Sequence, residues 1–314
     1  MIADLSSVEA ALGAEIQSDP DVVAGPMADL FEAGGKRLRP ALVLLSARCG
    51  HYDLEKLKPA AMAVEFTHAA TLVHDDVIDR SAVRRGRPTV AAELGDEPAI
   101  VIGDFYFAKA YEQAARTDST EVVAILARTV MEICAGEVRQ QSIRYQYSTD
   151  VDEYMHRIEA KTATLLAACC DIGSVLAGLP AKQRAALHAY GRMLGLAFQI
   201  ADDVLDYHGS VDEIGKPTGH DIAEGFATLP LMLAREDPDT ASKLDNVLSS
   251  ARKLNPQEAN EVAELVRGGN APQQALERAR EFAEAARRQL DAVEQSSARE
   301  ALVALTDYVV SRKL

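Results

Sequence analysis

Apolar residues recur along most of the chain with the three-to-four-residue spacing that places them on one face of an α-helix. No stretch alternates apolar and polar residues convincingly enough to predict a strand. Glycine and proline interrupt the helical pattern at 34–35, 86–88, 178–180, 215–217 and 237–238. The pattern predicts helices over residues 41–49, 57–79, 98–115, 121–141, 151–178 and 181–207, and several amphipathic helices from about residue 228 onward.

Composition supports an all-α protein. Hydrophobic residues make up 48% of the 314 residues, aromatic residues only 5%, and tryptophan is absent. Alanine and leucine dominate the apolar residues, and both favour helices. This length suffices for one large domain or two small ones, and no low-complexity linker divides it. We therefore expect a single all-α domain over residues 1–314, a helical bundle around a deep cavity.

Charge and cysteine content exclude several classes of protein. A formal net charge of −15 argues against general nucleic-acid binding and against attraction to an anionic membrane surface. No signal peptide, membrane-spanning stretch or basic amphipathic anchor is recognisable. The chain has four cysteines: Cys49, Cys134, Cys169 and Cys170. Their spacing matches neither a CxxC pair nor a zinc site, so they are interpreted as reduced residues of a cytoplasmic protein.

The most informative motifs are two aspartate clusters of the form DDxxD, each at the end of an apolar helix. The first contains Asp75, Asp76 and Asp79, and the second contains Asp202, Asp203 and Asp206. The outer aspartates of each cluster lie one helical turn apart and share a face, where like charges repel unless a cation binds. Mg²⁺ prefers oxygen ligands and often bridges carboxylates to phosphates. The pair predicts a metal-dependent diphosphate site, although a single such cluster is usually a solvated acidic face.

Basic residues accompany both clusters. Residues 84–89 read RRGRPT and residues 215–218 read GKPT, so each cluster is followed by a glycine, a cation, proline and threonine. This repetition resembles a faint internal duplication. Residues 34–40 read GGKRLRP, a glycine-rich turn with three cations that suits phosphate oxygens. His68 lies two helical turns before Asp75, on nearly the same face.

Taken in order, GGKRLRP, HDDVID with RRGRPT, Lys161-Thr162, Phe198-Gln199, ADDVLD and GKPTG closely resemble the trans-isoprenyl diphosphate synthase (polyprenyl synthase) family over residues 34–230. The resemblance implies an isoprenoid-synthase-type helical bundle around a central cavity, usually a homodimer. It also implies a transferase that condenses isopentenyl diphosphate with an allylic diphosphate in isoprenoid biosynthesis. The expected cofactor is Mg²⁺, or Mn²⁺ in its place.

The resemblance also implies roles for individual residues. Chief metal ligands would be Asp75, Asp79 and Asp202, with Asp76, Asp203 and Asp206 in support. The allylic diphosphate would contact Arg84, Lys161 and Lys216. Isopentenyl diphosphate would contact Lys36, Arg39, His68 and Arg85. Thr162 and Gln199 would lie near the reacting carbons, where their oxygen dipoles stabilise an allylic cation.

One departure from the family concerns the segment after the second cluster. Family members often have a lysine two residues before Thr-Leu-Pro, and Phe226 occupies that position here. We therefore expect one phosphate contact to be missing.

Product length depends on the helix before Asp75. Small side chains occupy the wall positions Thr67, Ala70 and Thr71, where short-chain members commonly place aromatics. Because each helical turn descends about 5.4 Å, roughly one isoprene unit, an open wall predicts a product of about six to ten units (C30–C50). Four bulky residues could still close this tunnel: Phe66, Phe105, Phe107 and Ile143.

Four alternatives remain at this stage. The chain could make a shorter geranylgeranyl or farnesyl product, or it could be the catalytic subunit of a heteromeric synthase. A class I terpene cyclase normally has Ser or Thr where Asp206 stands and Glu at position 210, which is Ser here. A helical scaffold with acidic faces would leave the ordered basic motifs unexplained.

Overall fold

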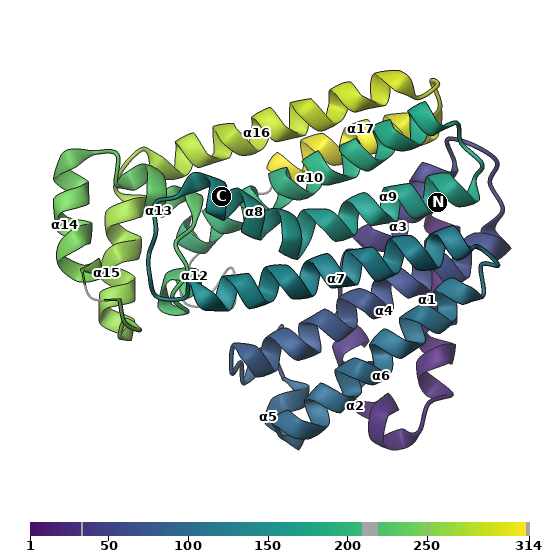
Figure 1. The fold of residues 1–314 in the computed structure, drawn as a ribbon, viewed down its shortest axis with the longest axis horizontal. Helices are drawn as coiled ribbons and strands as arrows, with labels where there is room; N and C mark the ends of the chain where they lie inside the picture. Colours follow the sequence, from purple (N-terminus) through teal and green to yellow (C-terminus); the bar gives the residue numbers. More distant parts are fainter. Residues whose placement is uncertain (33, 209–218, 250, 312–314) are drawn as a thin grey trace. The chain divides into compact units, whose positions relative to one another are not determined.

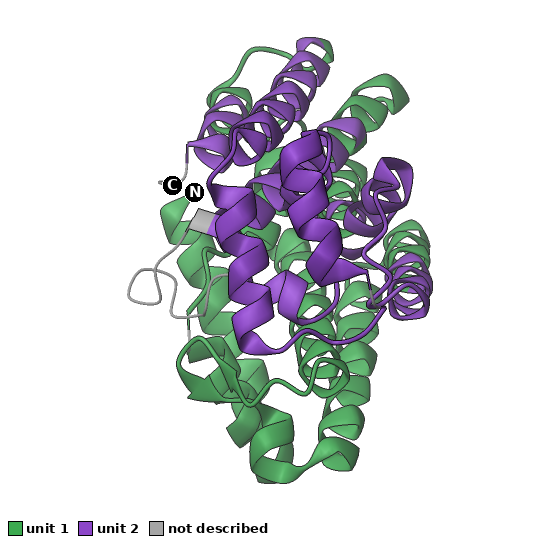
Figure 2. Ribbon diagram, turned by 90° about the vertical axis from the view of Figure 1, so that its left-hand side faces the viewer, with its two compact units in different colours: residues 1–130, 165–188, 292–302 green, residues 131–164, 189–291, 303–314 purple. Residues whose placement is uncertain are grey.

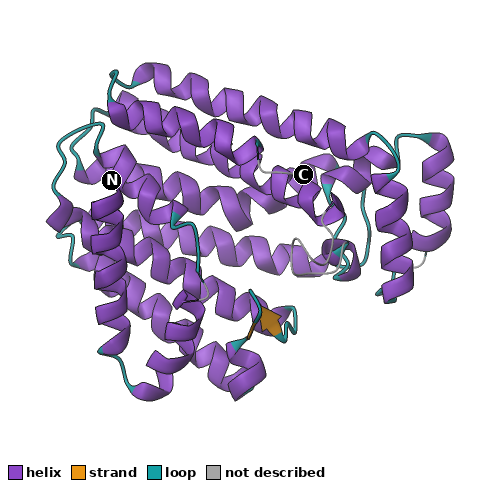
Figure 3. Ribbon diagram, turned by 180° about the vertical axis from the view of Figure 1, so that it is seen from behind, coloured by secondary structure: helices purple, strands orange, loops and turns teal. Residues whose placement is uncertain are grey.

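The computed structural model describes residues 1–32, 34–208, 219–249 and 251–311. Over these residues the protein is built from α-helices, with one two-stranded ribbon as its only sheet (Figures 1 and 3). The prediction of an all-α fold is confirmed. In the same residues, no helix combines the length and apolarity needed to cross a membrane.

Contacts divide the chain into two compact units, coloured separately in Figure 2. Unit 1 comprises Met1–Val130, Leu165–His188 and Ala292–Leu302, and unit 2 comprises Met131–Thr164, Ala189–Asp291 and Val303–Leu314. The organisation as one domain over residues 1–314 stays a prediction, and each unit is described by itself.

Unit 1 contains most of the N-terminal elements. Its complete elements are α1 (Ile2–Gln17), α2 (Asp21–Glu32), α3 (Leu38–Ala47), α4 (Leu54–Ile78), β1 (Val83–Arg84), β2 (Arg87–Pro88), α5 (Val90–Leu94) and α6 (Asp96–Ala115). Four further helices have residues in both units: α7 (Thr120–Ser142), α9 (Thr164–Leu176), α10 (Ala181–His208) and α17 (Ser297–Val310).

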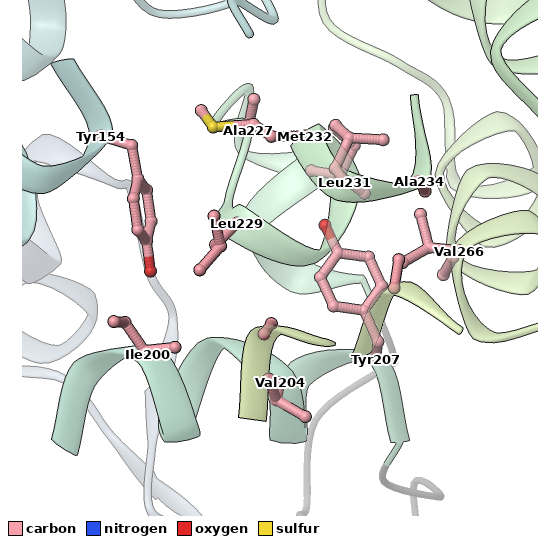
Figure 4. Close-up of a cluster of buried hydrophobic side chains, with 14 of the residues drawn as sticks. Tyr154, Ile200, Val204, Tyr207, Ala227, Leu229, Leu231, Met232, Ala234 and Val266 are labelled. Carbon is pink, nitrogen blue, oxygen red and sulfur yellow. The ribbon is translucent and has the colours of Figure 1, made fainter. Parts of the chain in front are cut away.

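Unit 2 contains the remaining elements. These are α8 (Val151–Ile158), the π-helical turn η1 (Glu159–Ala163), α12 (His220–Ala223), α13 (Leu229–Ala234), α14 (Pro238–Leu248), α15 (Pro256–Arg267), α16 (Ala271–Gln289) and most of the 3₁₀ turn η2 (Leu290–Ala292). Its core gathers apolar side chains from α8, α10, α13 and α15, including the fully buried rings of Tyr154 and Tyr207 (Figure 4).

The two helices that carry the acidic motifs begin and end close to their predicted bounds. Asp53 caps the start of α4 by accepting a hydrogen bond from the Glu55 amide, and α4 ends one residue before Asp79. Helix α10 extends to His208, so the second motif occupies its last two turns. In both cases the apolar pattern correctly predicts a long helix ending in aspartates.

Two local features were not predicted. The predicted helix over 151–178 is interrupted by η1, in which Lys161 and Thr162 lie. Such π-turns often mark functional positions. The RRGRPT segment forms the ribbon, with Val83 opposite Pro88 and Arg84 opposite Arg87. Its turn residues Arg85 and Gly86 have φ of 51° and 78°, as a two-residue hairpin turn requires.

Candidate active site

The first acidic motif lies at the end of α4 in unit 1. Asp76 is buried, and its two oxygens each accept a 2.9 Å hydrogen bond from Arg84 Nε. A further 2.8 Å ion pair joins Arg84 Nη2 to the same carboxylate. Asp75 and Asp79 are half-buried. The structure therefore separates the middle aspartate, which is neutralised by an arginine of the ribbon, from the two outer ones.

A close helix crossing fixes the position of this motif. The His74 ring packs on Phe107 of α6 and lies 3.0 Å from the Ile100 carbonyl oxygen. A Cβ atom at Gly103 would lie 2.2 Å from His74 Nε2. Only glycine leaves room for the ring there, so α6 holds the acidic end of α4 in place.

Beside this motif, unit 1 gathers arginines around His68. Arg37 pairs with buried Glu65 at 3.0 Å, whereas neither Arg39 nor Arg85 makes an ion pair within the described residues. A Cβ atom at Gly35 would lie 3.1 Å from Arg37 Nη1 and 3.3 Å from Arg85 Nη1. Two guanidinium groups thus approach the same glycine, and like charges held this closely favour a bound anion.

Electrostatics within this cluster point the same way. Burial lowers the pKa of His68 well below its usual value, and the positive charges of Arg39 and Arg85 lower it further. Burial also lowers the pKa of Arg39, whose buried Nε has no hydrogen-bond partner. His68 is therefore neutral at pH 7, and the cluster has hydrogen-bond donors left for phosphate oxygens.

The second acidic motif lies at the end of α10 in unit 2. Asp202 is exposed, whereas Asp203 is buried and accepts hydrogen bonds of 2.7 Å from Tyr154 Oη and from Gln199 Nε2. Burial and the charge of Asp221 raise the pKa of Asp203 well above its usual value. Asp206 accepts from the backbone amides of residues 220 and 221, at the start of α12. The second and third aspartates of this motif thus have protein partners.

In unit 2, Thr162 lies close to Gln199, and Lys161 lies close to Glu137. The Thr162 hydroxyl donates a 2.7 Å hydrogen bond to Gln199 Oε1, and Lys161 Nζ lies 3.3 Å from Glu137 Oε2. Close packing positions this group, because a Cβ atom at Gly195 would lie 2.4 Å from the Cα atom of Ala163 in η1. Lys161 and Thr162, which lie in this π-turn, are therefore fixed against α10.

The segment around Phe226 carries more positive charge than expected. Arg144 Cζ lies 5.3 Å and Arg157 Cζ 5.7 Å from the centroid of the Phe226 ring. Arg144 also bonds the Glu224 carbonyl oxygen at 2.7 Å, and Arg157 bonds that of Ala227. The Phe226 ring thus lies near two arginines that also bond to its loop. The replacement of the family's lysine by Phe226 did not predict these two arginines.

Side chains at the predicted chain-length wall are small and inward. Thr67 and Ala70 are buried and Thr71 is half-buried, and both threonine hydroxyls bond carbonyl oxygens of their own helix. Phe66 packs between Phe31 and Tyr106 in the core of unit 1. Of the other bulky candidates, Phe105 packs on Tyr106, Phe107 packs on His74, and Ile143 lies in unit 2 beside Tyr147 and Tyr154.

Two further predicted substrate contacts are Lys36 and Lys216. Lys36 is exposed, and Lys216 lies outside the described residues. Sequence reasoning also missed Tyr154 and Glu65 as parts of these clusters, whereas it included Arg37 as one of the three cations of the glycine-rich turn. Tyr154 and Glu65 lie outside the motifs and gave little signal, because each is recognised by a partner distant in the chain.

The donor chemistry fits Mg²⁺. Carboxylate oxygens of Asp75, Asp79 and Asp202 are hard ligands of the kind that Mg²⁺ prefers. Within the described ranges, no three His, Cys, Asp or Glu side chains converge as a metal site. Mg²⁺ does not require such a cage, since it usually takes one or two carboxylates together with water and substrate phosphates. The supporting role predicted for Asp76, Asp203 and Asp206 stays a prediction.

Fold and site together define a class of protein: an all-α enzyme with two aspartate-ended helices, a basic cluster beside the first and a polar hydrogen-bonded group beside the second. Residues 20–266 match the family model described as Polyprenyl synthetase. The chain belongs to this family. This finding confirms the resemblance drawn from the motifs, and with it the prediction of a prenyl diphosphate synthase, a transferase of isoprenoid chains.

Relatives of known name and structure agree with this assignment. The chain is 42% identical to "Heptaprenyl diphosphate synthase component 2" of Geobacillus stearothermophilus, over 74% of this chain and 73% of that protein. It resembles the crystal structure of polyprenyl synthase from Caulobacter crescentus CB15 complexed with calcium and isoprenyl diphosphate, with a TM-score of 0.93, 38% identity, and coverage of 99% and 95%. Geranylgeranyl pyrophosphate synthase from Lactobacillus brevis gives a TM-score of 0.90, 28% identity, and coverage of 99% and 96%.

Proposed function

We propose that this enzyme condenses isopentenyl diphosphate with an allylic diphosphate and makes a long trans-polyprenyl diphosphate. The observation that carries the proposal is the basic cluster of unit 1. Arg37 and Arg85 approach the same glycine, and Arg39 and Arg85 form no ion pair within the described residues. Such a concentration of cations is costly without an anion, and a diphosphate supplies the required charge.

In this cluster the second substrate binds. Arg39 and Arg85 present planar guanidinium groups to the diphosphate of isopentenyl diphosphate, and neutral His68 donates one further hydrogen bond. Lys36, an exposed residue next to Arg37 in the sequence, adds a point charge. Because His68 stays neutral, it adds no further positive charge to the repulsion between the arginines of this cluster.

The allylic diphosphate binds through the aspartates and Mg²⁺. Asp75, Asp79 and Asp202 would hold the ions, which would neutralise the negative charge of the leaving diphosphate. Lys161 and Lys216 contribute direct charge to the same group. Arg84 was expected to contact the allylic diphosphate, but in the structure its guanidinium pairs with the carboxylate of Asp76. We therefore assign Arg84 to support of the motif.

Condensation forms one carbon–carbon bond. The carbon–oxygen bond of the allylic diphosphate breaks with the electron pair leaving on diphosphate, and the isopentenyl double bond attacks the allylic cation. The carbonyl oxygen of Gln199 and the hydroxyl oxygen of Thr162 stabilise that cation by their dipoles. Loss of a proton then restores a double bond, and the released diphosphate accepts it.

The decisive experiment supplies the purified chain with farnesyl diphosphate, labelled isopentenyl diphosphate and Mg²⁺, and sizes the products by mass spectrometry. We expect a ladder ending at about six to ten isoprene units, because the predicted wall positions of α4 carry small side chains and each helical turn spans about 5.4 Å, roughly one isoprene unit. Absence of any elongation, with Mg²⁺ present, would refute activity of the chain alone. A cyclised hydrocarbon would instead identify a cyclase.

The wall on α4 has a direct test. Ala70→Phe adds a large ring at a buried position, so the longest product should shorten by several isoprene units. Gly13→Ala in α1, where nothing lies within 4 Å of the added Cβ atom, serves as the comparison. An unchanged product length in Ala70→Phe would exclude the predicted wall.

The relative named component 2 gives the heteromeric alternative its support. A homodimer in the cytoplasm remains our expectation from the family resemblance. Activity that appears only after addition of a second subunit would favour the heteromeric synthase, and activity of the isolated chain would favour the homodimer.

A further inference from the structure

We propose that Tyr154 is a positioning residue: through Asp203 it fixes the side-chain amide of Gln199 so that the amide oxygen stays beside Thr162. This inference rests on the proposed function, in which that oxygen stabilises the allylic cation. All four residues belong to unit 2, and they come from α8, η1 and α10.

Three hydrogen bonds link the four side chains. Tyr154 Oη donates to Asp203 Oδ2, Gln199 Nε2 donates to Asp203 Oδ1, and Thr162 Oγ1 donates to Gln199 Oε1, each at 2.7 Å. Tyr154 is fully buried, and Asp203 is 3% exposed. With one donor at each of its oxygens, the carboxylate has little freedom to rotate.

The direction of the Gln199 amide follows from these partners. Asp203 Oδ1 accepts from Gln199 Nε2, so the amide turns its NH₂ group toward Asp203 and its oxygen toward the Thr162 hydroxyl, which donates to it. The flipped amide would set its oxygen against an oxygen of Asp203 and lose the hydrogen bond to that residue. Removal of the Tyr154 hydroxyl frees Oδ2 and lets the carboxylate turn, and the amide then loses its fixed orientation.

A mechanistic consequence follows for the fate of the allylic cation. A well-oriented amide oxygen stabilises the allylic cation until the isopentenyl double bond attacks. When the amide is disordered, water can attack the cation instead. Loss of orientation should therefore lower turnover and increase the share of allylic substrate released as prenyl alcohol. Binding of both diphosphates uses other residues and should change little.

The same core offers a matched control. Tyr207 is also fully buried, and its hydroxyl lies 3.1 Å from Thr228 Oγ1. Figure 4 shows the Tyr154 hydroxyl directed toward the helix of Ile200 and the Tyr207 hydroxyl directed toward Leu231. Tyr207→Phe removes one buried hydroxyl without touching the linked group.

The experiment compares the wild-type chain with Tyr154→Phe and Tyr207→Phe. Steady-state elongation gives kcat and both KM values, radiolabelled farnesyl diphosphate gives the share lost as farnesol, and thermal melts report folding. We expect Tyr154→Phe to lower kcat by about tenfold or more, to raise the farnesol share, and to leave both KM values within about twofold. Tyr207→Phe should change the melting temperature by a similar amount, and it should release the same share of farnesyl diphosphate as farnesol as the wild-type chain does.

A double-mutant cycle with Gln199→Ala provides the second measurement. If Tyr154 acts through the amide, Tyr154→Phe has little further effect on kcat once Gln199 is alanine. Additive losses, equal effects of the two tyrosine variants, or an unchanged farnesol share would overturn the proposal. An inactive wild-type chain would refute the proposed function itself, and the positioning role would fall with it.

Discussion

At the scale of single residues, this enzyme keeps charges that a purely structural protein would avoid. Arg39 and Arg85 make no ion pair among the described residues, and burial lowers the pKa of both. Desolvated cations side by side destabilise the folded state, which supports the proposal that they bind an anionic ligand. Arg87, two positions from Arg85, differs because it pairs with Asp29 at 3.0 Å and Glu32 at 3.5 Å.

This contrast gives a prediction for two neighbouring arginines. Arg85→Gln should raise the KM for isopentenyl diphosphate by roughly 10- to 100-fold, since a hydrogen bond to a charged group contributes about 1.5–3 kcal/mol. It should leave the melting temperature unchanged or higher, because repulsion from Arg37 is relieved. Arg87→Gln should leave that KM unchanged. Steady-state kinetics and thermal melts decide, and equal KM effects in the two variants would argue against a diphosphate site.

At the scale of elements, the active-site helices are held by close crossings that exclude a Cβ atom. Gly103 admits the His74 ring beside the first acidic motif, and Gly195 admits the backbone of Ala163 beside the π-turn. Backbone cannot rotate away as a flexible side-chain end can. The Gly195 crossing therefore fixes how far η1, with Lys161 and Thr162, lies from α10.

We predict that Gly195→Ala destabilises the protein by about 1–3 kcal/mol, the usual cost of overpacking, because its Cβ atom would lie 2.4 Å from the Ala163 Cα atom. Since the π-turn must shift, kcat should fall with it. Gly13→Ala in α1 is the control: nothing lies within 4 Å of its Cβ atom. That variant should be neutral or more stable by up to about 1 kcal/mol. Urea unfolding of both variants measures the difference, and equal stabilities would contradict the steric account.

At the scale of the whole molecule, binding of the proposed ligands, a diphosphate and Mg²⁺, should stabilise the folded protein. The chain carries a net charge of −15, yet it collects arginines in unit 1 and aspartates at the ends of α4 and α10. A diphosphate with Mg²⁺ would neutralise both kinds of cluster. Ligands that bind only the native state raise its stability by mass action.

Thermal melts with MgCl₂ and inorganic pyrophosphate test this linkage. At about 100 times the dissociation constant, binding should stabilise the protein by ~2.7 kcal/mol and raise the melting temperature by several degrees. With EDTA in place of MgCl₂, the shift produced by pyrophosphate should largely disappear. A shift of the same size in EDTA would show that the aspartates do not bind metal with the diphosphate.

The sequence by itself determined the helices, the acidic motifs at their ends and the family. These features are local: a 3.6-residue period and an i, i+4 pair of aspartates can be recognised within one segment. The order of the basic motifs then indicated the class of enzyme.

Only the tertiary structure decided the partners of the two middle aspartates, Asp76 and Asp203. Arg84 reaches Asp76 because the ribbon turns back at Arg85 and Gly86, and Tyr154 reaches Asp203 across 49 positions of sequence. Hydrogen bonds between distant residues leave no periodic trace in the sequence, since each depends on how separate helices pack. For the same reason, the two equivalent-looking DDxxD motifs have different middle aspartates: one is neutralised by an arginine, and the other is joined to Gln199.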